Sequence, residues 1–360
     1  MLSRKVICMD RADLETLVAI NASERVGCVL LRRLLDRFGC LGAIATASER
    51  SLADVEGVGQ SAAADVRRML ADRRGARELD EAARLGVRLI PCDDPETPPG
   101  FKLLYDAPLV LYVRGTLLPE DAAAVSVVGT REATPYGLNA ADRLARELAE
   151  AGMTVVSGLA RGIDTAAHRG ALRAGRTIAV LGSGVMRVYP EDNSSLAARI
   201  TTRGCLLSEF SLRAEPNAVH FPRRNRLIAA LGLGTVVVES GESSGALITS
   251  DWAVEQGKEV FAVPGPITST ASKGCHNLIK QGAKLAACAD DILEEIGFER
   301  MTTPLSATED RVLEALRAGA RGAGDLVEET GLGLEEIEHA LEGLAKRGRA
   351  KREGEAYVRA

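Results

Sequence analysis

The sequence lacks a long apolar run, a closely spaced pair of cysteines and an excess of basic residues. No stretch approaches the roughly 20 apolar residues of a membrane helix, and residues 1–10 lack the apolar core of a signal peptide. We therefore expect a cytoplasmic protein without a membrane partner. The seven cysteines include no CxxC pair and the four histidines lie far apart, so we predict neither a disulfide framework nor a metal site.

The formal net charge of −5 excludes a protein that binds nucleic acid through a generally basic surface. A local basic cluster is still compatible with this sum, and the densest one spans residues 220–226. There Arg223, Arg224 and Arg226 accompany Phe221, with no acidic residue among the seven. Guanidiniums hold phosphates and an aromatic ring stacks on a base, so the cluster suits single-stranded nucleic acid. The alternative is an arginine-rich surface loop with solvated ion pairs.

The length of 360 residues exceeds that of an average domain, and the pattern predicts three. Residues 1–75 read as a small all-helical domain, SAM-like or helix-hairpin-helix. The glycines of its turn at 55–64 suit either a phosphate contact or simple helix packing. Residues 76–298 form the main domain, introduced by a proline-rich segment that we interpret as an irregular lead-in. Residues 303–360 read as a winged-helix domain.

The third helix of the predicted winged helix, at 334–346, carries four glutamates, which oppose entry into a DNA groove. We therefore expect this domain to contact protein. The basic residues that could still touch a DNA backbone are Lys346, Arg347, Arg349, Lys351 and Arg352.

The main domain alternates short apolar segments with helical ones. The apolar segments span 125–128, 153–157, 177–181, 205–208, 235–239 and 259–263. This alternation predicts the α/β class, with an extended Rossmann-like, doubly wound parallel sheet whose ligand lies beyond the carboxyl ends of the strands. Glycine-rich turns with helices directly behind them follow the first three segments, which favours an anion-binding cleft. These turns contain Gly129, Thr130 and Arg131, then Ser157, Gly158, Ala160, Arg161 and Gly162, and then Gly182, Ser183 and Gly184.

Familiar cofactor and catalytic motifs are missing. The run that begins at Gly182 has Arg187 where a dinucleotide fingerprint needs its third glycine, and no GxxxxGK[ST] loop is present. We therefore expect no cofactor. Asp164 and His168 are spaced like a catalytic pair, but we interpret Asp164 as the N-cap of a helix at 165–174 and His168 as a first-turn residue that bonds the loop or a phosphate. No catalytic residue is assigned.

These segments resemble motifs of the DNA-processing protein A family, also called DprA or Smf. The matching residues are Ser126–Arg131 with Tyr136 and Gly137, Ser157–Asp164 with Ala167 and His168, Tyr189 and Pro190 with Asn193, Ser208 and Glu209, Phe221–Arg226 with Ile228, Ser244 and Gly245 with Thr249, Val263–Gly265, and Lys273 with Gly274. The resemblance implies a non-enzymatic protein that binds and protects single-stranded DNA. It also implies a homodimer that helps to load the RecA recombinase during natural transformation.

The resemblance carries the DNA-binding role onto the glycine-rich turns and the arginine cluster. The full set of candidate contacts is Gly129, Thr130, Arg131, Ser157, Gly158, Ala160, Arg161, Gly162, Asp164, His168, Gly182, Ser183, Gly184, Phe221, Pro222, Arg223, Arg224, Asn225, Arg226, Ser244 and Gly245. The loop at 215–219 lacks a lysine that some relatives place in the pocket, so we expect Arg223 or Arg224 to compensate.

Two other functions stay open. A Rossmann-fold nucleotide hydrolase, similar to the cytokinin-activating phosphoribohydrolases, is the enzyme alternative, although residues 239–246 lack the PGGxGTxxE loop of those enzymes. An adaptor that binds RecA but has a vestigial pocket is the other.

Overall fold

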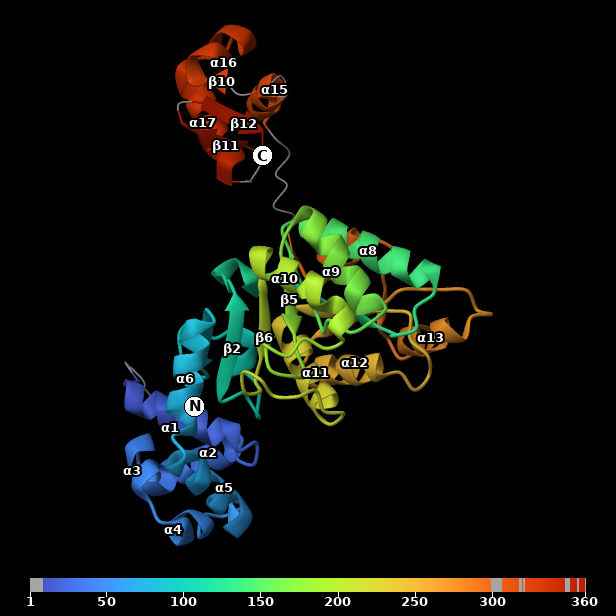
Figure 1. Ribbon diagram of the computed structural model, residues 1–360. Helices are drawn as coiled ribbons and strands as arrows, with labels where there is room; N and C mark the ends of the chain where they lie inside the picture. Colours follow the sequence, from blue (N-terminus) through green and yellow to red (C-terminus); the bar gives the residue numbers. More distant parts are fainter. Residues whose placement is uncertain are drawn as a thin grey trace. The chain divides into compact units, whose positions relative to one another are not determined.

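The computed structural model describes residues 9–298, 306–316, 319, 321–346, 350–354 and 356–359 (Figure 1). The chain divides after Phe298 into two compact units. The expected start of the last domain at residue 303, and the first eight residues of the expected N-terminal domain, lie outside the described residues. No helix in the described ranges is long and apolar enough to cross a membrane.

Six helices open the first unit. They are α1 (Arg11–Ala22), α2 (Cys28–Phe38), α3 (Leu41–Thr46), α4 (Glu49–Ala53), α5 (Gly59–Ala71) and α6 (Arg74–Arg84). Side-chain oxygens begin two of them, since Asp10 caps α1 and Ser48 caps α4. The predicted hairpin turn lies between α4 and α5, where Gly57 and Gly59 adopt φ values of 86° and 64° that favour glycine.

A nine-stranded sheet forms the centre of this unit (Figure 1). Its strands are β1 (Val87–Pro91), β2 (Val110–Gly115), β3 (Ala124–Gly129), β4 (Thr154–Ser157), β5 (Thr177–Val180), β6 (Cys205–Ser208), β7 (Gly234–Val238), β8 (Glu259–Ala262) and β9 (Lys284–Leu285). Their order is β1-β2-β6-β5-β4-β3-β7-β8-β9. All pairings from β6 through β9 in this order are parallel, so the predicted parallel α/β sheet is confirmed.

The proline-rich segment is not the irregular lead-in that the sequence suggests. Its two apolar stretches form β1 and β2, which pair antiparallel with each other, and β2 pairs antiparallel with β6. The prolines lie outside the strand interiors: Pro91 ends β1, Pro99 begins the short helix α7 (Pro99–Lys102), and the others lie in the chain between β1 and β2. They therefore interrupt the chain between the strands without preventing the pairing.

Helices cover both faces of the sheet. They are α8 (Pro135–Glu150), α9 (Ile163–Ala174), α10 (Ser194–Arg203), α11 (His220–Leu231), α12 (Gly245–Glu255), α13 (Lys273–Lys280) and α14 (Ala289–Glu295). Successive residues of β3 point to opposite faces, so Val125 and Val127 pack with α8 and α9 whereas Val128 packs with α11. Burial on both faces explains why the strands read as continuous apolar runs.

Helix α11 is held firmly at its carboxyl end. The Nζ atom of Lys258 donates hydrogen bonds to the carbonyl oxygens of Ala229, Ala230 and Gly232, at 2.9, 2.6 and 2.6 Å. These carbonyls have no partner within the helix, and a cation there also complements the helix dipole.

The second unit contains α15 (Ala307–Ala315), β10 (Arg321–Gly322), α16 (Ala323–Thr330), α17 (Leu334–Lys346), β11 (Ala350–Glu353) and β12 (Ala356–Arg359). Its three strands pair in the order β10-β12-β11. This succession is typical of a winged helix. The assignment of residues 303–360 to a winged-helix domain stays a prediction. Arg347 and Arg349, two of the basic residues that could touch a DNA backbone, lie outside the described residues.

The helices of the N-terminal module pack against the sheet, and their buried side chains belong to the same core as Val110 and Tyr112 of β2. Within the module, α1 and α6 approach closely at Gly75, where a Cβ atom would lie 1.8 Å from the carbonyl oxygen of Glu15. Whether residues 1–75 also fold as a separate domain stays a prediction.

We expect Gly75→Ala to lower the free energy of unfolding by about 1–3 kcal/mol, because α1 and α6 must separate to admit the methyl group. Gly42→Ala is the matched control, since no atom lies within 4 Å of its added Cβ and alanine favours the helix α3. Denaturant titration of both variants checks this. Equal stability in the two variants would contradict the close approach at Gly75.

Candidate functional site

A cleft of about 800 Å³ lies at the carboxyl ends of β3 and β7, the sheet edge that the sequence predicts for the ligand. Its walls come from the turn after β3, the start of α9, the first turns of α11 and the start of α12. The predicted residues that line it are Gly129, Thr130, Arg131, Ala160, Asp164, Phe221, Pro222, Arg224, Asn225, Ser244 and Gly245. The structure thus brings together parts of the chain more than a hundred residues apart.

The guanidinium of Arg224 forms a buried part of the cleft wall. The residue is only 4% exposed, and its Nη1 atom donates to the carbonyl oxygens of Gly158, at 2.8 Å, and of Val180. Its Nη2 atom has no hydrogen-bond partner among the described residues, which leaves a charged donor for a ligand. Burial lowers the pKa of Arg224 to about 10, with nearby Asp164 acting in the opposite direction, so the group stays cationic at neutral pH.

Asp164 does not cap a helix, contrary to our interpretation. Helix α9 begins two residues earlier than predicted, at Ile163, and its N-cap is Gly162. The Asp164 carboxylate instead accepts hydrogen bonds from the backbone N–H groups of Gly158 and Ala160, at 3.1 and 3.2 Å. Burial raises its pKa, while Arg224 and these amides stabilise the charged form. Asp164 therefore shapes the loop after β4 and balances the buried arginine.

An exposed arginine and two aromatic rings form the opposite part of the cleft. The guanidinium carbon of Arg131 lies 5.3 Å from the centre of the Phe221 ring, and the Tyr189 ring centre lies 5.8 Å from that of Phe221. Gly182 makes room for this arrangement, because a Cβ atom there would lie 2.7 Å from the Phe221 ring. Tyr189 is a cleft residue that our candidate set omits, although Tyr189 and Pro190 are among the matching motifs.

A carboxylate that follows β7 holds the turn that carries Arg131. Glu239 accepts hydrogen bonds from the backbone N–H of Thr134, at 2.9 Å, and from its hydroxyl, while its own carbonyl oxygen accepts the Thr130 N–H at 2.9 Å. Glu239 adopts a φ of 54°, which is rare outside glycine. The Glu239 contacts join residues distant in sequence, so no local pattern indicates them.

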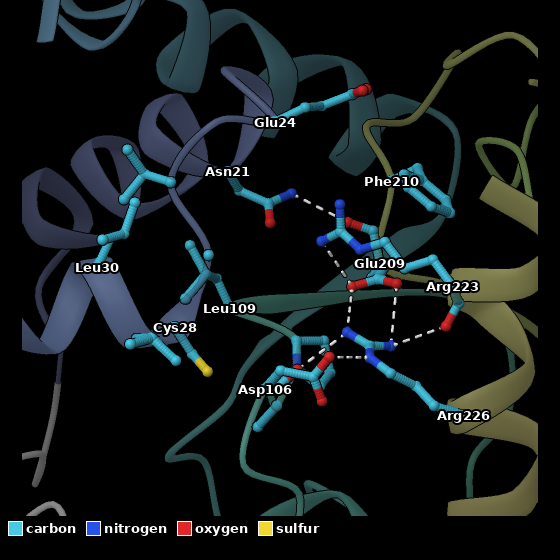
Figure 2. A pocket seen from close by; sticks show the side chains of 15 residues that line it. Asn21, Glu24, Cys28, Leu30, Asp106, Leu109, Glu209, Phe210, Arg223 and Arg226 are labelled. Atoms are coloured by element: carbon cyan, nitrogen blue, oxygen red, sulfur yellow. Dashed lines mark hydrogen bonds and ion pairs between the residues drawn. The ribbon is translucent and has the colours of Figure 1, made fainter. Parts of the chain in front are cut away.

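Arg223 and Arg226 face away from the cleft, so the prediction that three guanidiniums converge on one opening is wrong. Residues 220–231 form a helix and not a loop, and the two side chains line a separate pocket of about 260 Å³ (Figure 2). There both Nη atoms of Arg226 contact the carboxylate of Glu209, at 2.8 and 3.0 Å, and its Nε atom pairs with Asp106 at 2.7 Å. Arg223 also pairs with Glu209, at 3.1 Å.

Of the two arginines that we expect to compensate for the lysine missing from the 215–219 loop, only Arg224 lines the cleft. The compensation itself stays a prediction. Pro216 and Ala218 of this loop line the cleft, and Arg224 lines it too, whereas Arg223 does not. The carboxylate of Glu242, from the segment that we compared with the phosphoribohydrolase loop, is not part of the lining and lies 3.8 Å from Lys273.

Other predicted residues support the cleft from behind. The Ser157 hydroxyl donates to the carbonyl oxygen of Val127, and the exposed Arg161 pairs with Asp192 at 2.7 Å. Gly162 allows the loops after β3 and β4 to meet, because a Cβ atom there would lie 2.3 Å from the Thr130 carbonyl oxygen. Ser183 and Gly184 are buried, and the described chain starts no α-helix directly behind them, since α10 begins only at Ser194.

His168 bonds neither the loop nor the cleft, which corrects our interpretation. It is a fully buried residue of α9, and its Nδ1 atom lies 2.7 Å from the Thr177 hydroxyl oxygen. That hydroxyl donates to the Val155 carbonyl oxygen, so Nδ1 carries the proton that His168 donates. Its Nε2 atom has no hydrogen-bond partner in the part of the chain that the structure describes. Burial lowers the pKa of His168 to about 3, and Arg224 adds to the shift.

His168 makes stability depend on pH. The folded-state pKa of about 3 lies below the usual value of 6.5, so the unfolded chain binds the extra proton between these values. The free energy of unfolding therefore falls as the pH drops below 6.5, by about 1.4 kcal/mol per unit for this residue. In the wild type this residue makes the free energy of unfolding lower at about pH 5 than at about pH 7. We expect this difference in the free energy of unfolding to shrink by about 2 kcal/mol in His168→Asn, which keeps a donor near the position of Nδ1.

Denaturant titration followed by Trp252 fluorescence measures this, since Trp252 is the single tryptophan and lies in the same unit. Carboxylates contribute alike to wild type and variant, so they cancel in the comparison. An unchanged pH difference in His168→Asn would contradict a buried neutral imidazole.

Comparison with known proteins agrees with this geometry. Residues 88–297, more than half of the chain, match the family described as DNA recombination-mediator protein A. The chain belongs to this family. The DNA processing protein DprA of Bacillus subtilis (strain 168) is 41% identical over 213 residues, which cover 59% of this chain and 72% of that protein. The resemblance to the DprA/Smf family is thus confirmed.

Two solved structures of the family share the fold. The X-ray structure of DNA processing protein A from Streptococcus pneumoniae has a TM-score of 0.67 and 33% identity, covering 77% of this chain and 95% of that chain. DNA processing protein A from Helicobacter pylori has a TM-score of 0.54 and 28% identity, covering 59% of this chain and 97% of that chain. The Helicobacter pylori structure gives insight into a unique single-stranded DNA binding mode of that protein.

Proposed function

We propose that this protein binds single-stranded DNA in the cleft at the carboxyl ends of β3 and β7. The observation that carries the proposal is the pairing of two cations with two aromatic rings in one opening. Arg131 and Arg224 both line the cleft, and Phe221 and Tyr189 lie beside them. Arginine cations bind phosphates, and unpaired bases stack on aromatic rings.

The two cations are suited to different parts of this task. Arg224 is buried and its Nη1 atom is occupied by two carbonyl groups, so it presents a fixed Nη2 donor. Arg131 is exposed and rests on the Phe221 ring without an ion-pair partner among the described residues. A phosphate bound between them would replace water at Arg131 and meet a preorganised charge at Arg224.

Stacking would come chiefly from Tyr189, because its side chain is 48% exposed whereas Phe221 is partly covered by Arg131. Every base has an aromatic face, so such a site would tolerate any sequence. Ser244 and Gly245 at the start of α12 offer small residues and a helix N-terminus along the same opening.

We further propose that the protein acts as a homodimeric mediator that protects incoming strands in the cytoplasm and helps to load RecA on them during natural transformation. Membership of the recombination-mediator family supports this role. The geometry of the cleft supports the proposed DNA binding and gives no information about RecA loading or dimer formation.

Removing the cations should weaken binding and its dependence on salt. If about four phosphates are neutralised, the logarithm of affinity should fall with the logarithm of salt concentration with a slope near −3. We expect Arg131→Ala to weaken binding about tenfold and to reduce the steepness of this slope by about 0.7. Arg131→Ala combined with Arg224→Ala should reduce it by about 1.4.

Fluorescence anisotropy with a labelled oligothymidylate at several salt concentrations measures both effects. Arg77→Ala is the control of equal charge, because Arg77 is exposed on α6 and lines neither the cleft nor the Arg226 pocket. Circular dichroism verifies the fold of the double variant, since Arg224 also holds two loops together. If the affinity of the wild type does not depend on salt concentration, the proposal is contradicted.

Removing the exposed ring should weaken binding without changing the salt slope. We expect Tyr189→Ala to cost about 1–3 kcal/mol of binding free energy, while Tyr189→Phe retains affinity. Tyr105→Ala is the matched control, because Tyr105 is 75% exposed and outside the cleft. If Tyr189→Ala and Tyr105→Ala bind equally well, bases do not stack on Tyr189.

A further inference from the structure

The cleft continues past Arg131 into a second groove. This groove has a volume of about 620 Å³ and lies between the start of α8 and the exposed side of α9. Arg131 and Glu132 line both cavities, so the turn after β3 forms the ridge between them. A polymer that leaves the cleft across this ridge would enter the groove directly.

The charge in the groove is unevenly satisfied. Arg173 pairs with Asp142 at 2.8 Å, so these two charges balance each other. Arg169 lies one helical turn before Arg173 and is exposed, and its guanidinium has no ion pair or hydrogen bond with any described residue. A free guanidinium inside a groove is available for an anion. The lining carries three arginines, since Arg131 belongs to it as well, and two carboxylates, Glu132 and Asp142, which leaves one positive charge in excess.

The two helices that form the groove pack closely against each other. Helices α8 and α9 keep the floor of the groove fixed, because Gly170 lets α9 approach the Asp142 backbone to a distance that no side chain would allow.

We propose that the groove between α8 and α9 is a second subsite for single-stranded DNA, in which Arg169 binds a phosphate next to those held in the cleft. The inference rests on the proposed DNA binding in the cleft. It extends that proposal by defining the path of the strand from the cleft into the groove. A strand long enough to span both cavities gains the Arg169 contact, whereas a strand that fills only the cleft does not.

Oligothymidylates of two lengths, about 6 and about 20 nucleotides, test the subsite by anisotropy at several salt concentrations. We expect Arg169→Ala to weaken binding of the long strand about fivefold to tenfold and to reduce the steepness of its salt slope by about 0.7. The short strand should bind the variant as it binds the wild type. Arg169→Lys should restore most of the loss, since it retains the charge, and Arg77→Ala should change neither strand.

The outcomes distinguish failure of this inference from failure of the proposed DNA binding in the cleft. If the long strand binds Arg169→Ala and wild type equally, the groove is not on the path of the strand and the inference is overturned. If Arg169→Ala loses equal affinity for the short and the long strand, the inference is overturned as well, because Arg169 would then act only through long-range electrostatic attraction. If neither strand binds the wild type, the proposed function of the cleft fails, whatever Arg169 does.

Discussion

A single buried cation constrains the architecture of the cleft. Placing a guanidinium where little water reaches it is costly unless hydrogen bonds and an opposite charge surround it. Arg224 obtains these from the Gly158 and Val180 carbonyl oxygens and from the nearby Asp164 carboxylate. Because Asp164 in turn binds the amides of the same loop, the ends of β4 and β5, the start of α9 and the first turn of α11 are fixed together.

Helix α11 performs two tasks on two faces. Residues three apart share a helical face, so Arg223 and Arg226 both reach Glu209, while Arg224 between them points to the cleft. The first face joins the main domain to the N-terminal module, since the Arg226 pocket is also lined by Asn21 and Cys28 (Figure 2). The charge that is concentrated at residues 223–226 is thus divided between the cleft and contacts within the protein.

The strands and glycine-rich turns could be predicted from sequence because apolar runs and turn residues are local signals. The direction of each arginine could not, since it depends on recognising 220–231 as a helix. Pro222 and three arginines make that segment resemble a loop, although proline is tolerated in a first helical turn. Asp164 and Glu239 were equally hidden, because their partners are set by tertiary contacts with the loop after β4 and the turn after β3.

The clamp of Lys258 on the carboxyl end of α11 has a thermodynamic consequence. With three carbonyl groups held at one end and Arg224 locked at the other, the helix has little freedom left to lose when a ligand arrives. The entropy lost in forming a complex would then belong almost wholly to the flexible nucleotide chain. A protein of this kind would act as a rigid template that imposes its own shape on a bound strand.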